Sequence, residues 1–146
     1  MSSGLARDAI FAQHATLRGM LAELIATAGN AQAAAGLDDL LRGRARAFCE
    51  QLVAHMAFEE EVLAAALRDV IGVGAVIHEQ MDAEHRRQRE LLAAAMSALE
   101  AAERVSATLA DDVRAFANAV LVDMESEERG LLHADLDALM LEVKGG

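Results

Sequence analysis

Two short segments of the chain repeat an arrangement of side chains that can bind a metal ion. His55 precedes Glu59 by four residues, Asp123 precedes Glu127 by four, and each glutamate is followed by a second one. On an α-helix, residues four apart lie on one face, one turn from each other. Two such helices facing each other could therefore hold a metal centre between them.

Long helices are the elements that would position these pairs. Ala and Leu dominate, Pro is absent, and apolar residues recur at alternating steps of three and four along four stretches. This period is typical of the buried stripe of a helix in a bundle. Breaks at Gly29–Asn30, Gly36, Gly72, Gly74 and Ser106 predict helices over roughly residues 4–28, 37–70, 75–103 and 108–142. Thr108 and Asp111 are expected to form a capping box for the last helix.

Short connections between these helices predict an all-α fold, an up-down-up-down antiparallel four-helix bundle. The length suits one domain over residues 1–146, with no linker or low-complexity tract.

Six ionisable residues interrupt the apolar stripes where a bundle expects apolar side chains. They are His14, His55, Glu59, His85, Asp123 and Glu127. Such groups are costly to bury unless they are paired or bind a metal. Counted from turns near residues 33, 70 and 105, ligands on neighbouring helices differ in height by about three residues or fewer, a few ångströms at ~1.5 Å per residue. The sequence therefore predicts that the six converge at one level of the bundle.

This donor set of three imidazoles and three carboxylates suits iron or manganese, with zinc as a further option. Carboxylates can bridge two ions, so six ligands suffice for a dinuclear centre that keeps open positions. The alternative is a metal-free bundle whose buried carboxylates pair with the histidines.

Other histidines and glutamates near these six positions are expected to have other roles. His78 lies seven residues before His85 on the same helix face, so it could replace or assist His85, although height favours His85. Glu60 and Glu128 lie about 100° around the helix from the glutamates before them. They are expected in solvent or as hydrogen-bond partners of the ligands. His133 is expected at the surface.

Four segments carry a resemblance to a known family. They are Phe11–Arg18, His55–Glu60, Ala83–His85 and Asp123–Glu128. Together, and in this order over nearly the whole chain, they resemble the hemerythrin-like, or HHE, cation-binding domains. The resemblance implies a four-helix bundle with two non-haem iron ions. It matches His14, His55, Glu59, His85 and Glu127 to ligand positions, whereas Asp123 stands where the family usually has histidine.

The aspartate at position 123 bears on function. Its extra negative charge would favour the ferric state and argues against reversible oxygen carriage, although aspartate is a normal ligand of hard metals. The resemblance implies a protein that binds or senses dioxygen, nitric oxide or peroxide and has a role in iron and oxidative-stress handling. A di-iron enzyme of the catalase, peroxidase or ferroxidase type is one alternative. A structural bundle with a vestigial site is the other.

Composition narrows the partners and the compartment. A net charge of −11 argues against nucleic acid, and no apolar run approaches membrane-spanning length. Cys49 is the only cysteine, so it cannot form an internal disulfide and is expected in the core. The first four residues lack the features of a signal peptide. We therefore expect a cytoplasmic protein with a diatomic or peroxide ligand, and leave open a homodimer or a signalling partner.

Overall fold

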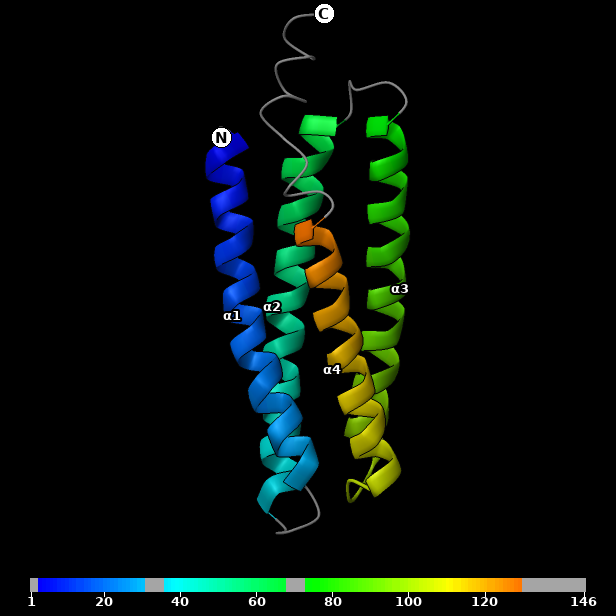
Figure 1. The fold of residues 1–146 in the computed structure, drawn as a ribbon. Helices are drawn as coiled ribbons and strands as arrows, with labels where there is room; N and C mark the ends of the chain where they lie inside the picture. Colours follow the sequence, from blue (N-terminus) through cyan, green and yellow to red (C-terminus); the bar gives the residue numbers. More distant parts are fainter. Residues whose placement is uncertain (1–2, 31–35, 68–72, 130–146) are drawn as a thin grey trace, which may run out of the picture.

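Four long helices make up the part of the chain that the computed structural model describes, residues 3–30, 36–67 and 73–129. They are α1 (Ser3–Asn30), α2 (Gly36–Leu67), α3 (Val73–Ala101) and α4 (Ala107–Glu127) (Figure 1). No strand occurs in these described ranges. The predicted helices are confirmed, with ends that differ by a few residues. Residues 130–142 of the fourth predicted helix, and with them His133, lie outside the described residues.

The helices run alternately up and down and form a closed ring. α1 contacts α2 and α4, and α3 contacts the same two helices from the other side (Figure 1). This is the predicted antiparallel four-helix bundle. It gives four inward-facing stripes, so side chains from all four helices can meet at its centre. None of the described helices combines the length and the apolarity that crossing a bilayer requires.

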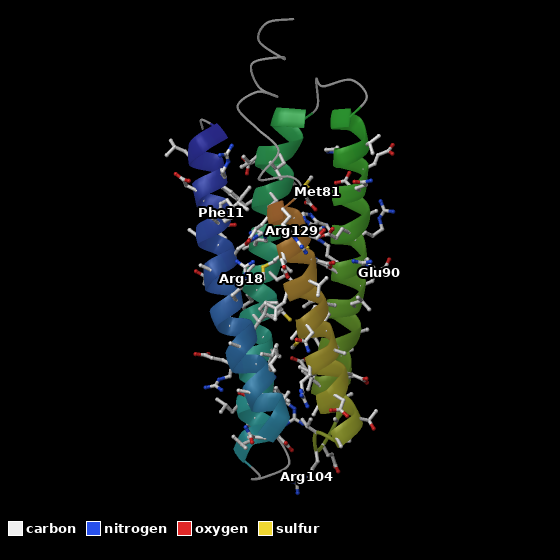
Figure 2. The ribbon with its side chains drawn as sticks, in the orientation of Figure 1. Phe11, Arg18, Met81, Glu90, Arg104 and Arg129 are labelled. Carbon is white, nitrogen blue, oxygen red and sulfur yellow. The ribbon has the colours of Figure 1, made fainter. Side chains whose placement is uncertain are left out.

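The bundle interior is apolar on both sides of one polar layer. The larger cluster of buried side chains lies toward the α1–α2 and α3–α4 connections and includes Leu21, Phe48 and Leu52. Three other apolar residues are buried on the opposite side of the polar layer: Ile10, Leu63 and Met81. Figure 2 shows Met81 toward that end of the bundle and Arg104 at the other. The polar layer is therefore packed between two apolar layers that keep water from it.

Hydrogen bonds cap the start of α4 and link α2 to the end of α3. The Ser106 side chain accepts a hydrogen bond from the Leu109 N–H, at 3.1 Å, and caps α4. The capping box expected from Thr108 and Asp111 was therefore wrong. Ser106, which precedes Thr108, is the N-cap of α4. The Arg42 guanidinium donates to the carbonyls of Leu99 and Ala102 at 2.9 and 2.5 Å, and so closes the end of α3.

Candidate metal centre

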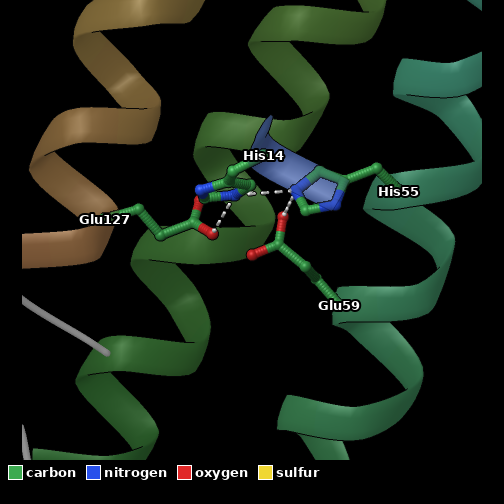
Figure 3. Close-up of side chains that lie close together, drawn as sticks. All are labelled: His14, His55, Glu59 and Glu127. Carbon is green, nitrogen blue, oxygen red and sulfur yellow. Dashed lines mark hydrogen bonds and ion pairs between the residues drawn. The ribbon is translucent and has the colours of Figure 1, made fainter. Parts of the chain in front are cut away.

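Four of the residues singled out from the sequence meet in the polar layer. His14 of α1, His55 and Glu59 of α2 and Glu127 of α4 each offer one ligand atom, and these atoms all lie within 4.8 Å of one another (Figure 3). The first three are at most 4% exposed, and the Glu127 side chain is 12% exposed. Donor atoms from three helices therefore crowd into a space of the size that a bound cation needs.

Short contacts link these four side chains. The Nε2 atoms of His14 and His55 lie 3.1 Å apart. His55 Nε2 is 2.5 Å from Glu59 Oε1, and His14 Nε2 is 3.4 Å from Glu127 Oε1. Figure 3 shows the two rings and the two carboxylates directed at one another. The i, i+4 spacing of His55 and Glu59 explains why one helix supplies two of the four groups.

The remaining helix, α3, contributes His85, which lies next to this group. Its residue is 1% exposed, and its Nε2 atom is 3.6 Å from Glu59 Oε1. Glu59 therefore lies between His55 and His85, where a carboxylate could bridge two ions. The rival residue, His78, has a side chain that is 36% exposed and 3.5 Å from Asp82. Of these two histidines, the structure brings only His85 to the polar layer.

Asp123 is bound to other partners. Its carboxylate accepts a hydrogen bond from Gln88 Nε2 at 2.9 Å and two from Arg87 Nη2 at 3.2 and 3.3 Å. The side chain is 18% exposed. The structure therefore gathers five of the six residues and engages the sixth in a separate cluster between α3 and α4.

Each histidine of the centre is held from behind by an oxygen acceptor. His14 Nδ1 bonds to Glu128 at 2.9 Å, and His85 Nδ1 bonds to Glu60 at 3.1 Å. The two glutamates thus serve as hydrogen-bond partners of the histidines, which was one of the two expected roles. His55 Nδ1 bonds to Gln13 Oε1 at 2.7 Å, a contact that sequence reasoning missed.

Two arginines that sequence reasoning also missed support these carboxylates. Arg18 Nη1 is 2.7 Å from Glu128 and Arg89 Nη1 is 2.7 Å from Glu60. Figure 2 shows Arg18 on α1, about halfway along the bundle. The signal in the sequence was their common position, because each arginine follows one of the histidines by four residues.

This outer arrangement determines which nitrogen of each ring can bind a metal. A carboxylate or an amide oxygen only accepts hydrogen bonds, so each Nδ1 must carry the proton that it donates. The Nε2 atom of a neutral ring then presents its lone pair to the centre. An acceptor behind the ring is the usual support of a metal-binding histidine. Three imidazoles are thus oriented as ligands before any ion binds.

The electrostatics of the outer carboxylates fit this role. The Arg89 guanidinium lowers the pKa of Glu60, and the Arg18 guanidinium lowers the pKa of Glu128. Both carboxylates are therefore ionised at neutral pH and accept hydrogen bonds. Burial lowers the pKa of His14, against the hydrogen bond to Glu128, which favours the neutral ring that a metal requires.

The two inner carboxylates have opposite pKa shifts. Burial acts to raise the pKa of Glu59, but hydrogen bonds to His55 and His85 outweigh it, so the pKa is lowered. Burial and the adjacent Glu59 carboxylate raise the pKa of Glu127 well above its ordinary value. Two buried carboxyl groups this close cannot both ionise without a compensating positive charge.

Two buried oxygens identify where that positive charge fits. Glu59 Oε2 and Glu127 Oε1 are both buried and have no hydrogen-bond partner among the described residues. Buried polar atoms of this kind call for an explanation, and an ion is one of the usual ones. A cation between the carboxylates and the Nε2 atoms would satisfy both oxygens. The nitrogen and oxygen donors suit iron, manganese or zinc, so the residues present fit a metal.

Comparison with known proteins gave one match. A family model described as the hemerythrin HHE cation binding domain matches residues 5–134. No curated protein and no solved structure matches the chain. The matched residues include all four described helices except the first two residues of α1.

Proposed function

The chain belongs to the hemerythrin HHE cation-binding domain family, and on that premise we propose that it binds two non-haem iron ions in the polar layer of the bundle. We further propose that the iron binds dioxygen, nitric oxide or peroxide, so that the protein senses or handles these molecules. Manganese and zinc are the alternative ions. The proposed compartment is the reducing cytoplasm.

One observation carries this proposal. Three buried histidines turn Nε2 inward because Glu128, Gln13 and Glu60 hold their other ring nitrogens. Glu59 and Glu127 add carboxylate oxygens to the same space. A bundle that only needed packing would place apolar side chains at these positions, because burying ionisable groups without a ligand destabilises the fold.

The protein's contribution is to hold this donor set in place. Iron bound here would supply redox chemistry and open positions for small ligands. The histidines and Glu59 would keep the ion in the centre, and the apolar layers around Met81 and Leu52 would limit the entry of water. A binding or sensing role needs only these elements, with the signal passed to a partner.

The test of this role is spectroscopic. Ferrous protein, prepared without oxygen, is mixed with nitric oxide, dioxygen or peroxide, and the absorption spectrum is recorded. We expect a new band that depends on the added ligand in the wild type. Glu59→Gln, which removes the central carboxylate charge, is expected to abolish it. If the wild-type spectrum matches that of free iron with the same ligand, the proposal is wrong.

The carboxylate content of the site favours an enzyme as the second candidate. Glu84, which is partly buried, faces Asp123 and Glu59 closely enough that burial and their charges raise its pKa to about 7. A groove of about 520 Å³ on the α3–α4 side of the bundle is lined by Asp123 and Gln88, among others. Carboxylate-rich iron sites suit the turnover of peroxide or of ferrous iron.

Turnover separates the two candidates. Holoprotein is given peroxide, or ferrous iron with oxygen, in large excess, and product is followed over many cycles for the wild type and for Glu59→Gln. An enzyme predicts many turnovers by the wild type and a much lower rate for the variant. Equal rates for wild type, variant and free iron would rule out the enzyme.

A further inference from the structure

The bundle contains two halves that repeat the same hydrogen-bonding scheme. In one half, His14 and Arg18 of α1 both contact Glu128 of α4, at 2.9 and 2.7 Å. In the other, His85 and Arg89 of α3 both contact Glu60 of α2, at 3.1 and 2.7 Å. By sequence, α1–α2 and α3–α4 are the two repeats, and the histidine and arginine of each repeat contact the glutamate of the other. Each repeat thus supplies equivalent residues to the centre.

The equivalence ends at position 123. By spacing from the glutamates, Asp123 on α4 corresponds to His55 on α2. The residue behind His55 is Gln13, which holds the ring by a 2.7 Å hydrogen bond. The residue at the corresponding place, one before His85, is Glu84. Glutamate carries a carboxyl group where Gln13 has an amide, and Asp123 bonds to Gln88 and Arg87 instead.

Two further exchanges accompany Asp123. Gln88 stands where α1 has Leu17, and Arg87 stands where α1 has Thr16. Leu17 is part of the apolar core, whereas Gln88 is a buried amide, 5% exposed. A buried amide needs a hydrogen-bond partner. Asp123 provides it at 2.9 Å and also pairs with Arg87 at 3.2 Å.

These contacts turn Asp123 into a clamp between α3 and α4. To bind a metal, the carboxylate would have to leave Gln88 without a partner in the interior and give up Arg87. Leaving a buried group unsatisfied lowers an equilibrium constant on the order of 10- to 100-fold. Gln88 and Arg87 thus satisfy Asp123 and are satisfied by it. A carboxylate that bound a metal would not need these two partners.

Resting on the proposed function, we propose that the centre is asymmetric and that Asp123 is a clamp residue and not a ligand. The tighter ion is bound by His14, His55, Glu59 and Glu127, the group whose ligand atoms lie within 4.8 Å of one another. The second ion is bound by His85 with the shared carboxylates and has fewer protein ligands.

A calorimetric titration of metal-free protein with Co²⁺, with absorption spectra of the same samples, tests the asymmetry. For wild type we expect one tight step and a second step at least tenfold weaker. Asp123→Asn keeps an oxygen for Gln88 and therefore preserves the fold, which circular dichroism checks. It is expected to change the affinity of neither step by more than about threefold, because the altered side chain binds neither ion.

A second variant converts the clamp into a ligand site. Asp123→His combined with Gln88→Leu restores in the α3–α4 half the residue types found in the α1–α2 half. We expect the second step to become at least tenfold tighter while the first is unchanged. Gln88→Leu alone is the control. Its second step is expected to tighten less than that of the double variant, and the gain it shows is the part of the affinity that comes from releasing Asp123 from Gln88.

The outcomes separate this inference from the proposed function. Two equal steps in the wild type, or a loss of tenfold or more in either step for Asp123→Asn, would overturn the asymmetry while leaving metal binding intact. Wild-type protein that binds no Co²⁺ and no Fe²⁺ would overturn the proposed function, and the inference with it.

Discussion

The Nε2 atoms of His14 and His55 lie 3.1 Å apart, although the other nitrogen of each ring already bonds to Glu128 or Gln13. Both outer partners are acceptors, so two neutral rings would direct two lone pairs at each other. A metal ion bound between the two rings would accept both lone pairs. Protons held by the groups around this space must leave when the ion binds, so protons and metal compete.

This competition predicts that metal binding releases protons. In the metal-free protein, burial and Glu59 raise the pKa of Glu127. Burial acts to lower the pKa of His85, but Glu59 and Glu60 outweigh it and raise the pKa. Both groups therefore stay protonated to a higher pH than usual, and a bound ion must displace their protons. Affinity should therefore rise with pH between about 6 and 8, by up to tenfold per unit for each proton released.

Calorimetry in two buffers measures this release directly. The observed heat of metal binding differs between buffers of different ionisation enthalpy in proportion to the number of protons released. We expect a release of about one proton or more per bound ion at pH 7. Equal heats in both buffers, together with an affinity that does not change with pH, would contradict the prediction.

Loss of an outer carboxylate should weaken metal binding without removing a ligand. Glu60→Ala takes away the acceptor that orients His85 and is held by Arg89. We expect the affinity of the step that involves His85 to fall about 10- to 100-fold. The matched control is Glu61→Ala, one residue further along α2 and exposed. Equal affinities for the two variants would show that the carboxylate behind His85 is dispensable.

The bundle and most of the centre could be predicted from the sequence because both follow from regular helix geometry. Apolar steps of three and four gave the helices. A constant rise per residue, with short turns, put His14, His55 and His85 at one height. The structure places these three histidines beside Glu59 and Glu127.

The partners of Asp123 could not be predicted in the same way. Height and helix face are alike for Asp123 and His55, so the pattern alone predicts the same role for both. The choice depends on side chains across the α3–α4 contact, where Gln88 and Arg87 offer hydrogen bonds. The cap at Ser106 was missed for a related reason, because serine and threonine two residues apart are equivalent by type.

Cys49 should react slowly with thiol reagents. Burial raises the pKa of its thiol to about 11, with a further contribution from Glu50. At pH 8 only on the order of one thiol in a thousand is then the reactive thiolate, against roughly one in ten in an unfolded chain. We expect native protein to react with a disulfide reagent about 100-fold more slowly than protein in urea. Similar rates would argue that the thiol is exposed and ready for redox chemistry.

Because Arg42 caps the C-terminal end of α3, its removal should destabilise the fold by a measurable amount. Arg42→Ala removes hydrogen bonds to the carbonyls of Leu99 and Ala102. We expect the free energy of unfolding to fall by about 1–2 kcal/mol and Tm to fall by roughly 3–8 °C. The control is Arg46→Ala, whose ion pair with Glu100 is about half exposed on both sides and should contribute little. A Tm loss for Arg46→Ala as large as for Arg42→Ala would contradict the capping role.

The most direct test of metal binding is the metal content of the protein purified without chelator and after anaerobic loading with ferrous iron. His55→Leu serves as the comparison, because an apolar residue at this buried position should keep or improve folding, as helix content by circular dichroism would show. We expect one to two iron ions per chain in the wild type, and less than one tenth of that in the variant. Wild-type protein that is folded but holds no more metal than His55→Leu would contradict the account, and the buried histidines and glutamates would then be only a polar layer of the core.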